Sequence, residues 1–212
     1  MMTTLPLYDL LIGTRNQAKG RELAELLEPW RFQVQTLLEV DCDSLVIVED
    51  GDSFASNSRK KATRQARHLG RWVLADDSGI EVDTLQGAPG IYSARYAGPE
   101  ATDAQNNAKL LAELAGLPDS RRTARYVCHI GVADPDGRLR AESEGICRGT
   151  IRTEPAGANG FGYDPLFEIR EYHRTLGQLG PVVKRAISHR ARALRAIVPQ
   201  LVALATSGAW QR

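Results

Sequence analysis

The sequence predicts an α/β fold, and three observations support this fold class. Short apolar runs typical of buried strands occur at residues 7–12 and 72–75. Helical spacing of apolar residues follows the first run, and a helix that begins at an N-cap is predicted before the second. Two longer runs around a strong turn signal predict a β-hairpin between residues 125 and 147. The chain has 212 residues, 42% of them apolar and 25% charged, which is enough for one domain with a sizeable core.

The first predicted elements are a buried strand at residues 7–12 and a helix at residues 21–28. Leucines recur on one face of this helix, and either Thr14 or Asn16 can cap it. The intervening turn favours anion binding, because the free N–H groups and the dipole of a helix N-terminus point into such a turn. Asn16 and Lys19 add side-chain donors. The spacing of a Walker phosphate loop is absent, so the turn alone does not identify the ligand.

Two further strands are predicted at residues 32–37 and 45–48, followed by a helix from Ser53, its N-cap, to Leu69. The helix is rich in basic residues, most of which we expect on a solvated face. Lys61 is the candidate for an inner face, from which it could reach a phosphate.

The most informative stretch is Ala75-Asp76-Asp77-Ser78-Gly79, where the strand at residues 72–75 is predicted to end in two carboxylates. Charge at the tip of a buried strand is costly unless it is paired, and a bound cation is a suitable partner. Oxygen ligands suit Mg²⁺, which takes one or two carboxylates and shares its other positions with water and phosphate. The acidic turn at Glu49 could bring a second carboxylate near Asp77. A solvated acidic turn is the alternative interpretation.

The next helix is predicted from its cap at Thr102 to Gly116. Its leucines should face the core, and Asn106, Asn107 and Lys109 should face water. The hairpin strands, at residues 125–133 and 139–147, are long enough to carry the sheet into a second lobe.

Residues 154–165 form a glycine-rich loop that contains Phe161 and Tyr163. Glycine lets the backbone approach a ligand closely, and the two aromatic rings could stack on a flat base. The alternative is a plain turn with two core aromatic residues.

The last predicted helix, residues 191–205, has Ser188 as its N-cap and contains Pro199, which should bend or divide it. His189 and Arg190 offer donors at the start of this helix, where an anion or a carbonyl oxygen would be favourable.

Charge and cysteine content exclude several classes of protein. The net charge of +1 provides no overall basic field for nucleic acid or membrane. The three cysteines, Cys42, Cys128 and Cys147, form no CxxC pair, which is typical of thiols in a reducing cytoplasm. No signal peptide and no apolar run of membrane-spanning length is recognised, so we expect a cytoplasmic protein.

Taken together and in order, six motifs resemble the inosine/xanthosine triphosphate pyrophosphatases, a family that acts on non-standard purine nucleotides. The resemblance extends over residues 7–205. The motifs are Thr14-Arg15-Asn16 with Lys19, Glu49-Asp50-Gly51 with Phe54 and Asn57, Ala75 to Gly79, Gly87 to Tyr96, Gly160-Phe161-Gly162-Tyr163-Asp164-Pro165, and Ser188-His189-Arg190.

The resemblance implies an elongated, mixed β-sheet with flanking helices in one domain over residues 1–212. It implies two lobes around a central active-site cleft, with no separable boundary between them. The implied reaction is Mg²⁺-dependent hydrolysis of ITP, dITP and XTP to the monophosphate and pyrophosphate. A homodimer is also implied, and residues 87–96 are a candidate interface.

The resemblance also assigns roles to individual residues. Asp77 matches the catalytic base and a metal ligand, and Asp76 and Glu49 are further metal candidates. Phosphate contacts are assigned to residues 14–19 and Lys61, and base contacts to the residues from 161 onward. The expected substrate-binding set is Thr14, Arg15, Asn16, Gln17, Ala18, Lys19, Lys61, Ser78, Phe161, Gly162, Tyr163, Asp164, Lys184, His189 and Arg190.

Two other functions are compatible with parts of this pattern. A phosphatase acting through an aspartyl-phosphate is disfavoured, because Asp76 and Asp77 are adjacent rather than spaced as Asp-x-Asp. A non-catalytic nucleotide- or RNA-binding module could use the stacking pair Phe161 and Tyr163. The near-zero net charge and the paired carboxylates disfavour RNA.

Overall fold

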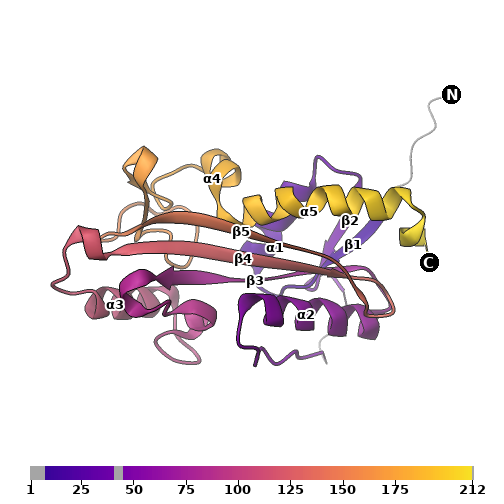
Figure 1. Ribbon diagram of the computed structural model, residues 1–212, viewed down its shortest axis with the longest axis horizontal. Coiled ribbons are helices and arrows are strands. Elements are labelled where there is room, and N and C mark those ends of the chain that lie inside the picture. Colours follow the sequence, from indigo (N-terminus) through magenta and orange to yellow (C-terminus); the bar gives the residue numbers. More distant parts are fainter. Residues whose placement is uncertain (1–7, 41–44, 212) are drawn as a thin grey trace. The chain divides into compact units, whose positions relative to one another are not determined.

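A computed structural model describes residues 8–40 and 45–211, and its centre is a mixed seven-stranded sheet flanked by helices (Figure 1). The strand order is β2-β1-β3-β4-β5-β6-β7. β1 pairs in parallel with β2 and β3, whereas β5, β6 and β7 pair antiparallel. The strands are β1 Tyr8–Ile12, β2 Phe32–Thr36, β3 Val73–Val82, β4 Thr123–Ala133, β5 Leu139–Ile151, β6 Phe167–Ile169 and β7 Arg174–Thr175. The helices are α1 Gln17–Leu27, α2 Phe54–Leu69, α3 Asp103–Glu113, α4 Pro181–Ile187 and α5 His189–Thr206. The predicted α/β class and the mixed sheet are therefore confirmed.

The chain divides into two compact units, neither of which is a continuous segment. Unit 1 contains residues 1–77, 129–144 and 193–212, and unit 2 contains residues 78–128 and 145–192. The chain passes from one unit to the other inside β3, β4, β5 and α5. The predicted hairpin exists as β4 and β5, and both of its strands contribute residues to both units.

In unit 1, helices cover both faces of the sheet. The consecutive residues Glu142 and Ser143 of β5 point to opposite faces, because side chains alternate along a strand. Glu142 accepts hydrogen bonds from Arg59 of α2, whereas Ser143 donates to the carbonyl of Ala193 in α5. Figure 1 accordingly shows α2 and α5 on opposite sides of these strands. Apolar residues such as Leu11 and the β3 segment Val73–Ala75 are fully buried between these layers.

Unit 2 has a separate hydrophobic core, built by its parts of β3, β4 and β5 together with β6 and α3. Leu110 and Leu114 contribute the apolar face predicted for the third helix. Tyr163 and Phe167 come from the glycine-rich loop and from the strand that follows it. Tyr163 thus anchors the loop at residues 154–165 to this core.

The first helix begins earlier than predicted, at Gln17 rather than Arg21. Asn16 is its N-cap, with the side-chain oxygen accepting the Lys19 N–H at 3.0 Å. The choice left open between Thr14 and Asn16 is thereby decided, since Thr14 Oγ1 instead accepts the Asn16 N–H.

The prediction that the strand at residues 72–75 ends at the two carboxylates is wrong, because β3 continues through both of them to Val82. Ile80 and Val82 are fully buried and extend the apolar strand beyond the charged pair. Lysines pair with Asp76 and Asp77, so the charges are tolerated in the middle of the strand.

The strand predicted at residues 45–48 does not form, and Val46 and Val48 are exposed. Pro199 does not divide the last helix, which runs from His189 to Thr206 with Ile197, Val198 and Leu201 buried. An apolar face packed on the sheet outweighs the single backbone donor that proline lacks.

Two surface predictions for α3 also need correction. Asn106 is buried and bonds to the backbone of Ala94 and Ala97, and Asn107 is half-buried and donates to Gly162. Neither side chain simply faces water, because two loops pack against the predicted polar side of the helix.

Neither Cys128 nor Cys147 is in a disulfide, and both are buried. Burial raises the pKa of the Cys147 thiol to about 11. Cys42 lies outside the described residues. No helix within residues 8–40 and 45–211 combines the length and apolarity needed to cross a membrane.

Candidate active site

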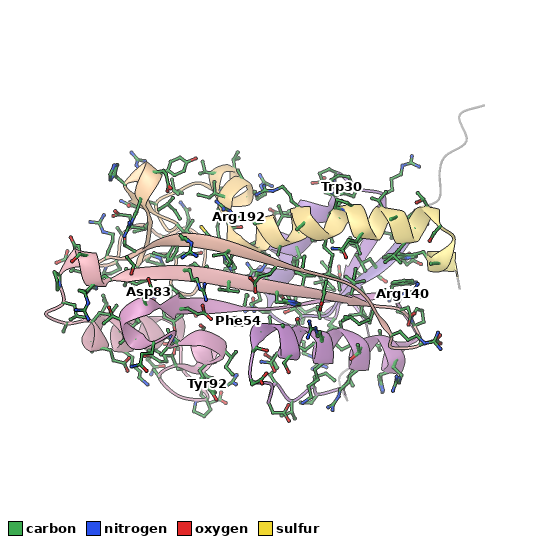
Figure 2. The ribbon with its side chains drawn as sticks, viewed as in Figure 1. Trp30, Phe54, Asp83, Tyr92, Arg140 and Arg192 are labelled. Atoms are coloured by element: carbon green, nitrogen blue, oxygen red, sulfur yellow. The ribbon has the colours of Figure 1, made fainter. Side chains whose placement is uncertain are left out.

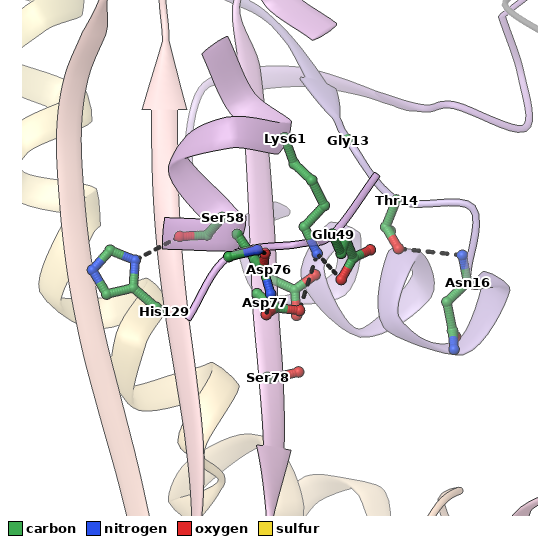
Figure 3. A network of polar contacts seen from close by, with 12 residues as sticks. Gly13, Thr14, Asn16, Glu49, Ser58, Lys61, Asp76, Asp77, Ser78 and His129 are labelled. Carbon is green, nitrogen blue, oxygen red and sulfur yellow. Dashed lines mark hydrogen bonds and ion pairs between the residues drawn. The ribbon is translucent and has the colours of Figure 1, made fainter. Parts of the chain in front are cut away.

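The candidate active site starts from the two carboxylates in the middle of β3, both of which are buried (Figure 3). One oxygen of Asp77 lies 3.1 Å from Lys61 Nζ, and the other accepts a hydrogen bond of 3.1 Å from Asn57 Nδ2. Asp76 Oδ2 lies 3.6 Å from Lys19 Nζ. Helices α1 and α2 thus each supply a lysine to one of the adjacent carboxylates.

Helix α2 is built to present two polar residues to β3. Asn57 and Lys61 are four residues apart and therefore share one face of the helix. Ser53 caps the helix as predicted, with its hydroxyl accepting the Ser56 N–H. Lys61 Nζ also lies 3.4 Å from Glu49 Oε2, so Lys61 joins Glu49 to Asp77. The expected approach of the acidic turn to Asp77 is present.

Burial and charge act against each other in this cluster. Burial alone would lower the pKa of Lys61, but the carboxylates of Asp77, Asp76 and Glu49 together raise it. Burial raises the pKa of Asp77, although Lys61, Lys19 and the Asn57 hydrogen bond oppose that rise. Lys61 is therefore held as a cation, and the Asp77 carboxylate needs positive neighbours to stay ionised.

The donor chemistry of this cluster fits a hard divalent cation. Three carboxylates, from Glu49, Asp76 and Asp77, share two lysine cations. Within the described part of the chain, no group of three or more His, Cys, Asp or Glu side chains is arranged to hold a metal ion, so these residues offer no complete cage. A complete cage is not what Mg²⁺ requires, since it typically uses one or two carboxylates and takes its other ligands from phosphate and water.

The predicted phosphate turn precedes and begins α1. Gly13 approaches α2 so closely that a Cβ would lie 2.0 Å from Gln65 Oε1, and Gln65 Nε2 donates to the Gly13 carbonyl. Arg15 donates to the Leu45 carbonyl at 3.3 Å. Gln17 is exposed and Ala18 half-buried in the first turn of α1. A surface cavity of about 320 Å³ adjoins this turn and includes Asn16 and Gln17 in its lining.

Unit 2 holds the residues predicted to contact a base. Asp164 Oδ2 accepts the Phe161 N–H at 2.9 Å and lies 2.7 Å from Lys184 Nζ. Lys184 Nζ is 4.7 Å from the centre of the Phe161 ring, and the Arg190 guanidinium is 5.7 Å from it. Phe161 is half-buried, whereas Tyr163 belongs to the core. Of the two aromatic side chains, Phe161 is therefore the more accessible.

His189 and Arg190, the predicted pair at the start of α5, contact different partners. Arg190 Nη2 donates to Ser78 Oγ at 3.0 Å, and Ser78 directly follows Asp77 in β3. The His189 ring stacks on the Tyr126 ring, with 4.5 Å between centroids and 7° between planes. Ser188 caps the helix, as predicted, by accepting the Ala191 N–H.

Comparison with known proteins places the chain in a family. The sequence profile described as the Ham1 family matches residues 10–200. This chain belongs to the Ham1 family.

Relatives within the Ham1 family cover nearly the whole chain. A protein of Rhodopirellula baltica is 53% identical over 95% of this chain and 96% of its own length, and it is named dITP/XTP pyrophosphatase. A protein of Desulforamulus reducens with the same name is 49% identical over 88% of this chain and 92% of its own length.

Solved Ham1 structures share the fold. The HAM1 protein of Coxiella burnetii has a TM-score of 0.81 at 36% identity and covers 95% of this chain and 100% of its own. A nucleoside-triphosphatase, or dITP/XTP pyrophosphatase, of Mycobacterium abscessus has a TM-score of 0.72 at 41% identity and covers 90% of this chain and 99% of its own.

Several residues of this Ham1 chain contact the predicted site residues but received no role from sequence. Asn57 bonds to Asp77, Tyr126 stacks on His189, and Asp103 and Asn107 of α3 bond to the backbone N–H and carbonyl of Gly162. The spacing of Asn57 and Lys61 on one helix face was a usable signal for Asn57. Tyr126, Asp103 and Asn107 had no such signal, because their partners are distant in sequence.

Proposed function

We propose that this chain is an Mg²⁺-dependent pyrophosphatase that hydrolyses ITP, dITP and XTP to the nucleoside monophosphate and pyrophosphate. The observation that carries the proposal is the buried network of Asp76, Asp77 and Glu49 with Lys19 and Lys61. The names of relatives up to 53% identical over most of the chain support the same reaction.

The residues of unit 1 suit the triphosphate. Lys19 and Lys61 supply positive charge for the phosphates, and the N-terminus of α1 adds backbone N–H groups. Asp77 would hold Mg²⁺ through a carboxylate oxygen, with Asp76 and Glu49 as the candidates for a second ligand. When bound there, the ion neutralises phosphate charge and makes a bound water more acidic.

Asp77 is the proposed catalytic base. In the ionised form it accepts a proton from the attacking water as the water oxygen bonds to the α-phosphorus. The bond from the α-phosphorus to the bridging oxygen breaks, and pyrophosphate leaves with that oxygen. Lys61 Nζ lies 3.1 Å from one oxygen of Asp77 and favours the ionised form that this role requires.

The residues of unit 2 suit the base. Phe161 offers a ring face for stacking, and Arg190 and His189 supply donors for the carbonyl at position 6 of hypoxanthine and xanthine. Adenine carries an amino group there, and a guanidinium has no acceptor to offer it. Each buried donor left without a partner costs about 1–3 kcal/mol, which disfavours ATP.

Two further proposals concern the cellular location and the oligomeric state of the chain. The two buried, non-disulfide cysteines are consistent with a reducing cytoplasm, which we propose as the location. We also propose that the chain forms a homodimer through residues 87–96.

A product assay tests the proposed function. The purified chain is incubated with Mg²⁺ and, separately, ITP, XTP, dITP, GTP and ATP, and both pyrophosphate and orthophosphate are measured. We expect pyrophosphate from ITP, XTP and dITP and little product from ATP. Orthophosphate as the direct product would indicate a phosphatase, and binding without any product would indicate a nucleotide-binding module.

A further inference from the structure

Asn57 uses both ends of its side-chain amide inside the acidic cluster, and it is only 1% exposed. Its Oδ1 accepts the Gly51 N–H at 2.8 Å, and its Nδ2 donates to Asp77 Oδ2 at 3.1 Å. The partners determine the amide orientation, because a backbone N–H requires an acceptor and a carboxylate requires a donor. One side chain thus connects the segment before α2 to the middle of β3.

The segment before α2 is packed tightly against Asn57. A Cβ on Gly51 would lie 2.6 Å from Asn57 Oδ1 and 2.6 Å from Ser56 Oγ. A side chain at position 51 would therefore displace the amide or the segment. Glu49 lies two residues before Gly51 and reaches Lys61 Nζ at 3.4 Å. Anchoring Gly51 fixes the backbone next to Glu49, and with it the distance from Glu49 to the other carboxylates.

We propose that Asn57 is a positioning residue, which orients the Asp77 carboxylate and holds the Glu49 segment beside it. This inference rests on the proposed function. Lys61 binds the other oxygen of Asp77, so two donors from one helix face bind the two carboxylate oxygens and define the plane of the group. Asn57 itself touches neither substrate nor metal in this role. It acts through Asp77 and Glu49.

A buried asparagine can also serve only the stability of a fold, and the chain offers a matched control for that role. Asn106 of α3 is 2% exposed, accepts the Ala97 N–H at 2.8 Å and donates to the Ala94 carbonyl at 3.2 Å. It is buried to nearly the same degree as Asn57 and likewise uses both ends of its amide, but it donates to a backbone carbonyl, and its partners are not residues of the candidate site.

The test compares Asn57→Ala, Asn57→Asp and Asn106→Ala with the wild type. Hydrogen–deuterium exchange of the peptide that contains Gly51 reports the anchor without any nucleotide or metal. The rate constant kcat and the KM for ITP are measured with Mg²⁺ at about pH 9, where an introduced carboxyl group is ionised. Thermal unfolding of each variant accounts for lost stability.

We expect Asn57→Ala to accelerate exchange at Gly51 and to lower kcat about 10-fold to 100-fold with much less change in KM, because a displaced catalytic group lowers the rate of the chemical step. Asn57→Asp keeps an oxygen for Gly51 N–H but places a carboxylate oxygen against Asp77. We therefore expect near wild-type exchange at Gly51 with a kcat at least as low as that of the alanine variant. Asn106→Ala should lose stability and keep kcat.

A wild-type kcat in either Asn57 variant would overturn the proposal, as would equal losses of kcat in Asn57→Ala and Asn106→Ala. Unchanged exchange at Gly51 in Asn57→Ala would overturn the anchoring part, whether or not the chain hydrolyses nucleotides. Failure of the proposed function has a different signature, since wild-type protein would then release no pyrophosphate while the exchange data still report on the anchor.

Discussion

Asp77 combines burial, a neighbouring lysine and a position in the middle of a strand, so its charge should matter more to catalysis than to folding. We expect Asp77→Asn to lower kcat about 100-fold to 10,000-fold, because the amide keeps the volume but cannot accept the proton. Thermal unfolding should change little, since the substitution also removes the cost of burying a charge.

The matched control for this prediction is Asp83→Asn. Asp83 accepts a hydrogen bond from Thr123 and is labelled in Figure 2, and it is not part of the candidate site. The kcat of Asp83→Asn should remain near that of the wild type. An Asp77→Asn enzyme with a tenth or more of wild-type kcat would show that another group is the base.

Arg190 should discriminate between bases. Arg190→Met fills a similar volume without donors, so kcat/KM for ITP should fall about 5-fold to 150-fold, which corresponds to the loss of about 1–3 kcal/mol. The small activity on ATP should change much less. Arg185→Met, at an exposed position on α4, serves as the control. Equal losses on both nucleotides would mean that Arg190 holds a group common to both, such as a phosphate.

Residue identities were easier to predict than residue contacts. Asp76 and Asp77 stand out because two adjacent carboxylates follow an apolar run. The bond from Arg190 to Ser78 joins positions 112 residues apart, and no local pattern encodes it. Tyr163 was open to two interpretations, and its hydroxyl bond to the Ser93 carbonyl and its place in the core favour the structural one.

At the scale of elements, α2 packs against β4 through a buried histidine. His129 Nδ1 lies 2.7 Å from Ser58 Oγ, and Nε2 lies 3.9 Å from Glu142. The charges of Glu144 and Arg59 also influence the pKa of this imidazole ring. Burial lowers the pKa of His129 below its usual 6.5, although Glu142 opposes that shift. The folded protein therefore binds a proton here more weakly than the unfolded chain does.

This difference predicts a pH dependence of stability. The contribution of neutral His129 is complete above about pH 6.5 and is lost as the pH falls from there toward the lowered pKa. The free energy of unfolding of the wild type should thus decline more steeply on acidification than that of His129→Gln. Urea titrations across this range measure both slopes. If the free energy of unfolding declined equally with pH in the two proteins, His129 would not be the source of the pH dependence.

Two helix starts that local capping decides were predicted well, whereas a strand end that packing decides was not. Ser53 and Thr102 both cap helices as predicted. The end of β3 was predicted too early, because polar residues inside a strand resemble a turn until their lysine partners are known. Helix α4 was not predicted, since its seven residues provide too short a pattern.

At the scale of the whole molecule, we predict that two copies of the chain associate into a homodimer. Residues 87–96 include the 3-10 helix Gly90–Arg95, and Tyr92 on it is 56% exposed (Figure 2). An exposed aromatic side chain on an ordered turn suits an interface. We expect sedimentation of the wild type as a dimer at micromolar concentration and dissociation of Tyr92→Glu. A wild-type monomer at that concentration would reject the dimer.

The central claim is hydrolysis at the α-phosphorus of a non-standard purine triphosphate, and isotope tracing tests it most directly. ITP and ATP are mixed with the enzyme and Mg²⁺ in water labelled with heavy oxygen, and the products are analysed by mass spectrometry. We expect label in inosine monophosphate, unlabelled pyrophosphate, and ATP left almost intact. Label in pyrophosphate or in orthophosphate, or equal consumption of ATP, would contradict it.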